Sequence, residues 1–390
     1  MMPESLYVHI PFCLKRCFYC DFVSGIYDPQ KEAVYIEALK KEISDIPQKT
    51  SFSTLYIGGG TPTSLSAGTL TGLIKHIHKH INFMDDYEAT IEANPGTIDK
   101  EKLLAARYSG INRISIGVQS FNDDELKLLG RLHSSDDAER AVLLARECGF
   151  RNIGVDLIYG IPGQEVSEWR KTLERAVSLR PEHISVYELT AEDGTLLYEY
   201  LKSPTLPLVL AKEGISSRKW RVIEEDQIIE MYEYTIDFLK KEGYLHYEIS
   251  NFSLPGFACR HNLNYWDAGS YYGAGLGAHS HINRKRFHNT DNLEEYINFM
   301  SNGVNPVKGE EEITPEMAVS EALFLGLRRT DGMDLKKFTK SFRSDIMSSF
   351  RKEISEFEES GLIEVYDSGS RIRLTRKGLL LSNEVFIRFM

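Results

Sequence analysis

Six short apolar runs, each followed by a polar or glycine-rich loop, constrain the fold of this chain more than any other feature of its sequence. The runs lie at residues 6–12, 54–59, 88–94, 113–119, 152–160 and 183–189. Several of them are apolar without alternation, which is typical of parallel strands that are covered on both faces. The sequence therefore predicts a parallel sheet whose strands are joined by right-handed crossovers.

Helical patterns fill the spaces between these runs, with apolar residues recurring three and four positions apart. They lie at residues 31–46, 66–80, 99–109, 123–129, 135–148 and 165–179. Six strand–helix units are too few for a closed eight-stranded barrel, so we expect a partial (βα)6 barrel of the α/β class. In such a fold the functional site lies at the carboxyl ends of the strands.

Residues 191–310 are less regular, and Pro204 and Pro207 indicate a linker near the start of this region. A helix is expected at 227–242. The segment that follows is dense in Gly, Tyr, Asn and His and favours loops and short strands. We expect this region to complete the barrel of residues 1–190 and to take part in substrate binding.

Residues 311–390 have a different plan. Helices are expected near 315–329, 334–342 and 344–360, and a β-hairpin with its turn at residues 367–369 follows them. Three helices followed by a hairpin predict a winged-helix-like α+β domain at the C-terminal end.

The formal net charge of −11 argues against a general nucleic-acid-binding surface, which requires a basic footprint. Arg371, Arg373, Arg376 and Lys377 make a modest basic strip at the expected hairpin. We favour a docking or lid role for the winged-helix-like domain and expect no nucleic-acid partner.

No stretch approaches the roughly 18 consecutive apolar residues of a membrane span, and the segment MMPESLYVHI lacks the layout of a signal peptide. We expect a cytoplasmic protein without a transmembrane segment, with peripheral contact to a membrane left open. Disulfides are rare in the cytoplasm. The five cysteines of the chain therefore indicate another use.

Three of the cysteines, Cys13, Cys17 and Cys20, lie in the string CLKRCFYCDF directly after the first expected strand. Thiolates hold iron–sulfur clusters, usually four at a time, so three would leave one iron open to another ligand. A structural zinc site requires four ligands, often from two C-x2-C pairs, and no second pair is visible. The spacing favours a cluster, with a zinc-stabilised interaction protein as the remote alternative. Cys148 lies in a helical pattern and is expected in the core.

Other chemically capable residues follow the later strands. The string GGGTPT at 58–63 contains glycines that allow a ligand to approach the backbone closely. Glu92 ends the third expected strand, Arg131 is a candidate partner for a carboxylate, and Asp156 could hold a ribose hydroxyl. Because parallel strands end at the same edge, these groups are expected to meet.

The string YVHIPFCLKRCFYCDF resembles the entry motif of the radical SAM superfamily. The resemblance implies that Cys13, Cys17 and Cys20 bind a 4Fe–4S cluster. S-adenosylmethionine (SAM) would then chelate the fourth iron through its amino and carboxylate groups. The flanking pattern YxHIPFC is similar to the oxygen-independent coproporphyrinogen III oxidase family, and it implies an electron donor such as a flavodoxin or ferredoxin.

The same resemblance implies a set of residues that surround SAM. These residues are Tyr7, Tyr19, Gly59, Gly60, Thr61, Glu92, Gln119, Arg131 and Asp156. In the family the glycine loop meets the amino group of SAM. Gln119, Arg131 and Asp156 would lie near a second SAM or between the two.

The string CRHNLNYW at 259–266 is a second candidate binding site, after the three-cysteine string. An isolated histidine is more often a hydrogen-bonding residue than a ligand, but an imidazole beside large aromatic rings is also how proteins hold haem. The pattern HNxxYW resembles the signature of the haem-chaperone, or HemW-like, branch of the family. It implies that His261 ligates haem and that haem passes to haem-accepting apoproteins. Cys259 is a rival ligand, and His279 in GAGLGAHS is a further candidate.

Two departures separate the chain from the decarboxylating enzymes of the family. Those enzymes carry a further cysteine two residues after the third ligand, where this chain has Phe22. They also have a long N-terminal extension, whereas six residues precede Tyr7 here. Both departures favour a haem chaperone. The alternative is a coproporphyrinogen III oxidase or another radical SAM enzyme that modifies a tetrapyrrole.

Overall fold

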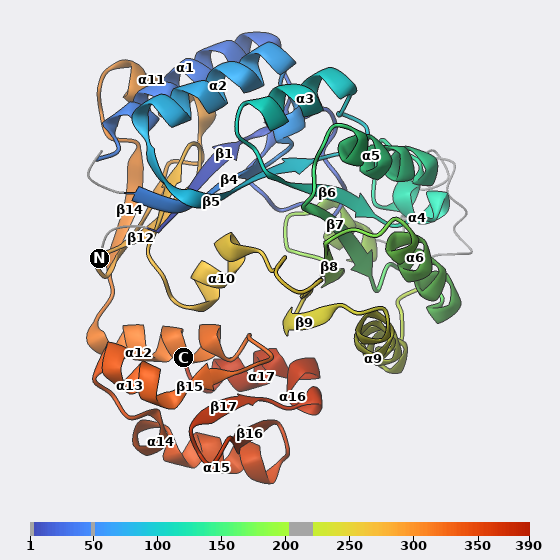
Figure 1. Ribbon diagram of the computed structural model, residues 1–390, viewed down its shortest axis with the longest axis vertical. Helices are drawn as coiled ribbons and strands as arrows, with labels where there is room; N and C mark the ends of the chain where they lie inside the picture. The colour runs from blue at the N-terminus through green and yellow to red at the C-terminus, as the bar shows by residue number, and fades with distance from the viewer. Residues whose placement is uncertain (1–3, 48–50, 203–220) are drawn as a thin grey trace.

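The computed structural model describes residues 4–47, 51–202 and 221–390 (Figure 1). The linker predicted around Pro204 and Pro207 lies outside these residues. The main element is a sheet of 12 strands, of which a central set is parallel. In spatial order the parallel strands are β11 (Tyr271–Ala274), β1 (Ser5–Ile10), β4 (Ser51–Gly59), β5 (Asn82–Ala93), β6 (Arg113–Gln119), β7 (Ile153–Tyr159) and β8 (His183–Glu188). The six predicted strands are among them, in chain order.

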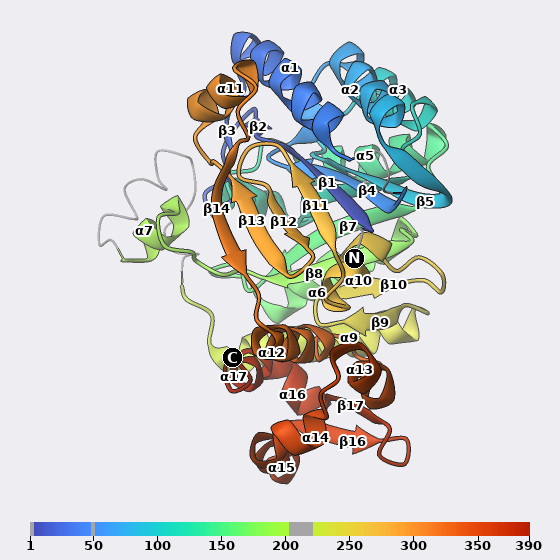
Figure 2. The same cartoon turned by 90° about the vertical axis from the view of Figure 1, so that its left-hand side faces the viewer.

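Antiparallel strands extend this sheet at both edges (Figure 2). Beyond β11 lie β12 (His279–Ile282), β13 (Lys285–Asn289) and β14 (Val307–Glu312), and beyond β8 lie β10 (Asn251–Ser253) and β9 (Leu245–Glu248). Since β14 and β9 are the two ends of the sheet, the barrel is open. The predicted partial (βα)6 barrel is confirmed, and β11 adds a parallel strand that the sequence pattern did not reveal.

The helices between the strands also follow the prediction, with ends within two residues of the expected ones. They are α1 (Pro29–Asp45), α2 (Ala67–His80), α3 (Lys100–Tyr108), α4 (Asp123–Leu128), α5 (Ser135–Glu147) and α6 (Val166–Ser178). Side-chain caps fix several starts: Asp99 accepts from the Lys102 amide, and Ser134 forms a capping box with Asp137. Further along the chain lie α7 (Leu196–Lys202), α9 (Glu225–Lys241), α10 (Arg260–Trp266) and α11 (Leu293–Ser301).

Two large hydrophobic cores and one small cluster around Leu128 and Ile161 organise the described residues. The first contains buried side chains from Leu6 to Met300 and joins the barrel with the region after it, so the boundary predicted at residue 190 does not separate two cores. The second gathers residues between Ala322 and Phe389. Among the described residues, no helix is both long enough and apolar enough to span a membrane.

The C-terminal region has the predicted order of helices followed by a hairpin. Its elements are α12 (Pro315–Gly326), β15 (Met333–Asp334), α13 (Leu335–Phe342), α14 (Ile346–Ser349), α15 (Arg351–Glu359), β16 (Ile363–Tyr366), β17 (Arg371–Leu374), α16 (Arg376–Leu380) and α17 (Ser382–Ile387). The turn of the hairpin holds Asp367, Ser368 and Gly369 at positive φ. The short β15 adds a third strand to this small sheet.

The arginines of the basic strip are paired with acidic side chains. Arg371 pairs with Asp331 at 3.4 Å and Arg373 with Glu364 at 2.7 Å. Arg376 pairs with Asp237 of α9 at 2.7 Å, which ties the C-terminal domain to the barrel. This pairing lowers the positive potential that the strip offers to a polyanion.

Candidate functional site

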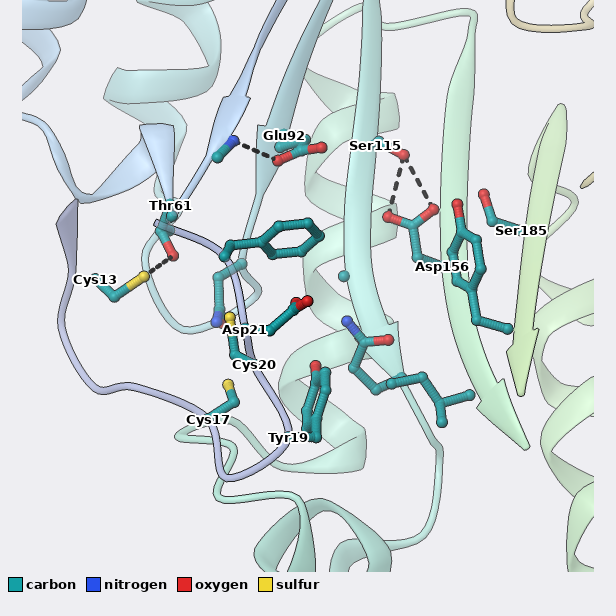
Figure 3. A pocket seen from close by; sticks show the side chains of 18 of the residues that line it. Cys13, Cys17, Tyr19, Cys20, Asp21, Thr61, Glu92, Ser115, Asp156 and Ser185 are labelled. Carbon is teal, nitrogen blue, oxygen red and sulfur yellow. Dashed lines mark hydrogen bonds between the residues drawn. The ribbon is translucent and has the colours of Figure 1, made fainter. Parts of the chain in front are cut away.

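A cavity of about 370 Å³ opens at the carboxyl ends of the parallel strands. It brings together most of the residues singled out in the sequence. Its lining includes Cys13, Cys17, Tyr19, Cys20, Gly59, Gly60, Thr61, Glu92, Gln119, Arg131 and Asp156. In Figure 3 the cysteines and Tyr19 lie toward one end of the cavity, and Ser115, Asp156 and Ser185 lie toward the other.

The loop that carries Cys13, Cys17 and Cys20, called the cysteine loop below, has its two ends joined by backbone pairing. The short strand β2 (Phe12–Cys13) pairs with β3 (Gly25–Ile26), and the Tyr27 amide donates to the Cys13 carbonyl at 2.9 Å. At its far end the Phe18 amide donates to the Leu129 carbonyl at 3.1 Å. The loop is therefore fastened to the barrel on both sides.

All three thiols are free of disulfides. The Thr61 hydroxyl donates to Sγ of Cys13 at 3.5 Å, and Nη1 of Arg131 donates to Sγ of Cys17 at 3.4 Å. Burial raises the pKa of the Cys13 thiol and raises the pKa of Cys20 to about 11. Because metal ligation requires thiolates, a strongly cationic group is needed to hold these sulfurs in the charged form.

The three sulfurs are not gathered around the position of a single ion. Within the described ranges, no group of three or more His, Cys, Asp or Glu side chains is placed to bind one metal ion. A 4Fe–4S cluster takes one thiolate on each of several irons, so its ligands can be spread around one end of a cavity. The donor set, three cysteines without a fourth, fits a cluster with one open iron.

The glycine loop, residues 58–63 at the end of β4, packs its backbone against the chain at Ile10 and Phe12, just before the cysteine loop. The Gly60 amide donates to the Ile10 carbonyl, and the Thr61 amide donates to the Phe12 carbonyl, both at 2.8 Å. A Cβ on Gly60 would lie 2.9 Å from the Phe12 carbonyl oxygen and 3.0 Å from Sγ of Cys13. Glycine is required there because any side chain would displace the start of the cysteine loop.

Glu92 ends β5 inside the cavity. Its carboxylate accepts from the Tyr56 hydroxyl at 2.9 Å and from the Gly59 amide at 3.1 Å. Burial raises the pKa of Glu92 to about 7, against the lowering effect of the Tyr56 hydrogen bond. The carboxyl group is therefore poised to ionise when a cation arrives.

Arg131 and Gln119 converge near the end of β6. Nη2 of Arg131 donates to the Gly117 carbonyl at 2.6 Å, whereas its buried Nε has no partner among the described residues. Gln119 is held at φ 69°, a left-handed conformation that non-glycine residues adopt uncommonly. A Cβ on Gly117 would lie 3.0 Å from Nε2 of Gln119 and 3.4 Å from Nη2 of Arg131, so a glycine makes room for both.

Asp156 lies across the cavity from the cysteines. The Ser115 hydroxyl lies 3.2 Å from each of its carboxylate oxygens, and burial raises the pKa of the group. Ser115 and Ser185 both line the cavity beside it.

Several cavity residues were not anticipated, among them Tyr56, Arg113, Ser115, Ser185 and Asn262. Arg113 is 1% exposed, and its Nε and Nη1 have no hydrogen-bond partner in the described part of the chain. The signal that could have found it is the alternation of strand residues: Arg113, Ser115, Gly117 and Gln119 recur at every second position and line one cavity.

Two of the predicted site residues lie outside this cavity. Tyr7 lines a second hollow and shares a hydrogen bond of 3.0 Å with Nδ1 of His9. His261 is 1% exposed on α10, which lies between the sheet and the C-terminal domain (Figure 1). Its Nδ1 lies 2.8 Å from the Thr54 hydroxyl and its Nε2 lies 2.9 Å from the Tyr265 hydroxyl. With both nitrogens bonded and no exposed edge, His261 does not fit an axial haem ligand in this arrangement.

The remaining cysteines are buried as well. Sγ of Cys259 lies 3.6 Å from Glu88, and burial raises the pKa of this thiol to about 12. Cys259 is 0% exposed and does not line the cavity, so it does not reach a bound group there in this arrangement. Cys148 is buried in the first core, as expected.

Family models match most of the chain in two parts. Residues 7–176 match the radical SAM superfamily, and residues 313–381 match the HemN C-terminal domain. Among solved structures, the chain is similar to coproporphyrinogen III oxidase (HemN) from Escherichia coli, with a TM-score of 0.81 and 26% identity. That likeness covers 100% of this chain and 90% of the enzyme.

Curated relatives are similar over the whole length. The chain is 37% identical to the "Heme chaperone HemW" of Bacillus subtilis, covering 99% of each protein. It is 36% identical to the protein of the same name from Lactococcus lactis, covering 100% of this chain and 97% of the relative. The open barrel, its three-cysteine loop and these matches define a radical SAM protein. Within that superfamily, the chain belongs to the HemW family.

Proposed function

We propose that this protein is a haem chaperone that holds a 4Fe–4S cluster on Cys13, Cys17 and Cys20, binds SAM and passes haem to apoproteins. The observation that carries the proposal is similarity over the whole chain to curated heme chaperones. Phe22 supports it, because the related decarboxylating enzymes have a further cysteine at the corresponding position.

The polar groups of the cavity fit the two cofactors. When bound, the cluster supplies a redox centre with one iron open to a further ligand. Each carboxylate oxygen of Glu92 accepts one hydrogen bond and keeps a lone pair for an N–H of the amino group of SAM. The unpartnered Nε of Arg131 could bind the carboxylate of SAM, and Asp156 could bind its ribose hydroxyls.

Haem transfer is the test of this function. The reconstituted protein should bind ferric haem with a Soret band and deliver it to an apohaemoprotein such as apomyoglobin, followed by absorbance. A chain that takes up no haem, or that keeps all of it in the presence of the acceptor, would contradict the proposal.

Coproporphyrinogen III oxidation is the second candidate, because the chain is similar in structure to that oxidase over its whole length. Incubation with coproporphyrinogen III, SAM and a reductant should give no decarboxylated product. A vinyl-bearing product would reverse the order of the two candidates.

A further inference from the structure

A second hollow of about 650 Å³ lies beside the barrel, between the β11–β13 edge and α12. We name it the histidine groove. Residues of the groove that matter here are Phe22, Tyr271, His279, His281, Phe324 and Leu325. Arg286 of β13 pairs with Glu321 of α12 at 2.5 Å and holds the two walls together. The volume is within the range of small-molecule and cofactor sites.

Two histidines of β12 face this groove. His279 and His281 are two residues apart on one strand, so their side chains lie on the same face of the sheet. His279 is exposed, and neither imidazole forms a hydrogen bond with another described residue. The His279 ring stacks on His288 at 5.0 Å between ring centres, which fixes its orientation.

The groove also offers flat apolar surface. Phe22 is 63% exposed, which is unusual for so large an apolar side chain, and it lines the groove together with Phe324 and Leu325 of α12. Tyr271 lies opposite His281 in the ladder, with ring centres 6.1 Å apart. Histidine is one of the axial ligands with which proteins hold haem, and the groove places an imidazole beside flat aromatic surface.

Helix α10, which carries the HNLNYW string, contributes Tyr265 to this groove. Tyr265 lines the groove, whereas its hydroxyl reaches back to Nε2 of His261 at 2.9 Å. His261 thus supports a wall of the groove from inside the barrel and does not reach the groove itself. Asp21 and Phe22 line both hollows, so the groove adjoins the cysteine loop.

We propose that haem binds in the histidine groove with His279 as its axial ligand and Phe22 against the macrocycle, an inference that rests on the proposed haem-chaperone function. His281 and His288 stand beside the ligand and are not required for coordination.

The test is a titration of the full-length, haem-free protein with ferric haem, followed through the Soret band. His279→Ala should weaken haem binding about tenfold or more, as loss of a metal-supporting group does. Phe22→Ala should weaken binding without changing the position of the band. His80→Ala, a change of a half-buried histidine on α2, should leave the spectrum unchanged.

A cavity variant adds a readout that a structural role for His279 would not give. In His279→Gly, free imidazole should restore the Soret band of the wild type. If the wild type binds no haem, the proposed function fails. If the wild type binds haem and His279→Ala binds it equally, the function stands and the groove assignment is wrong. Zinc that competes with haem only in the presence of His279 would also support ligation at this residue.

Discussion

Nδ1 of His261 lies 2.8 Å from the hydroxyl of Thr54, although the two residues are 207 positions apart in the chain. Thr54 donates its own proton to the Ser5 hydroxyl at 2.8 Å, so His261 is the donor to Thr54, and its Nε2 accepts from Tyr265. The ring also lies 5.0 Å from the ring of Tyr56. Helix α10 therefore anchors the inside of the barrel through a neutral, fully bonded imidazole.

Replacement of His261 should lower stability. His261→Ala removes the acceptor of the Tyr265 hydroxyl and the donor to the Thr54 hydroxyl, and it opens a cavity, which should reduce the free energy of unfolding by about 2–4 kcal/mol. Urea denaturation at pH 7.5 measures this loss. His80→Ala should cost far less, and equal losses in the two variants would contradict the anchoring role.

The pH dependence of that loss has a defined sign. Burial lowers the pKa of His261 to about 3, whereas an unfolded histidine titrates near 6.5. As pH falls below about 6.5, His261 becomes protonated in the unfolded chain but stays neutral in the folded chain. The free energy of unfolding of the wild type therefore falls by up to about 1.4 kcal/mol per pH unit. His261→Ala lacks this dependence. The difference between the two proteins should therefore shrink between pH 7.5 and pH 5.5, and a constant difference would show that His261 titrates normally.

Each cysteine of the loop should be required for iron. Anaerobically reconstituted wild-type protein should hold about four irons per chain, and Cys13→Ser, Cys17→Ser or Cys20→Ser should lose most of them. Cys148→Ser is the matched control, because Cys148 is buried in the first core and lies outside the cavity. Analysis of iron and acid-labile sulfide per chain measures this loss, and iron-free protein with tightly bound zinc would contradict the presence of a cluster.

The parallel part of the barrel could be predicted from the sequence because burial on both faces leaves unbroken apolar runs, and local caps such as Asp99 set the helix starts. The strands β11 to β14 at the other edge of the sheet could not be predicted in this way. Strands β11 and β12 have four residues each and carry mixed side chains, so their pairing beside β1 depends on contacts between distant segments.

The candidate site, too, could be predicted only where the signal is local in the sequence. Cys13, Cys17 and Cys20 are informative because their spacing alone defines a donor set. The neighbours of His261 in the sequence are compatible with a ligand and with an anchor, and only the contact to Thr54 distinguishes the two. Arg113 was missed because an arginine at the start of a strand gives no signal by itself, and only its alternation with Ser115, Gly117 and Gln119 places it on the cavity face.

Glu92 should make SAM binding depend on pH. Its pKa near 7 means that the carboxylate that would accept a hydrogen bond from the amino group of SAM is lost as pH falls below 7. Wild-type affinity should then weaken by up to about tenfold per pH unit. Glu92→Gln should bind SAM weakly at all pH values, as measured by calorimetry. Because burial disfavours the ionised carboxyl, this variant should be no less stable than the wild type at pH 8, and a loss of stability would instead indicate a damaged fold.

Arg113 should set the midpoint of that pH dependence. Nε and Nη1 of the buried guanidinium have no hydrogen-bond partner among the residues that the structure describes, and its charge lowers the pKa of both Glu92 and Asp156. Arg113→Met removes this charge and should move the midpoint of SAM binding upward by about one pH unit or less, the size expected for a charge acting across a partly polar interior. Arg107→Met on α3, outside the cavity, should leave the midpoint unchanged. An unaltered midpoint in Arg113→Met, with the fold intact by circular dichroism, would show that Arg113 does not act on the SAM site.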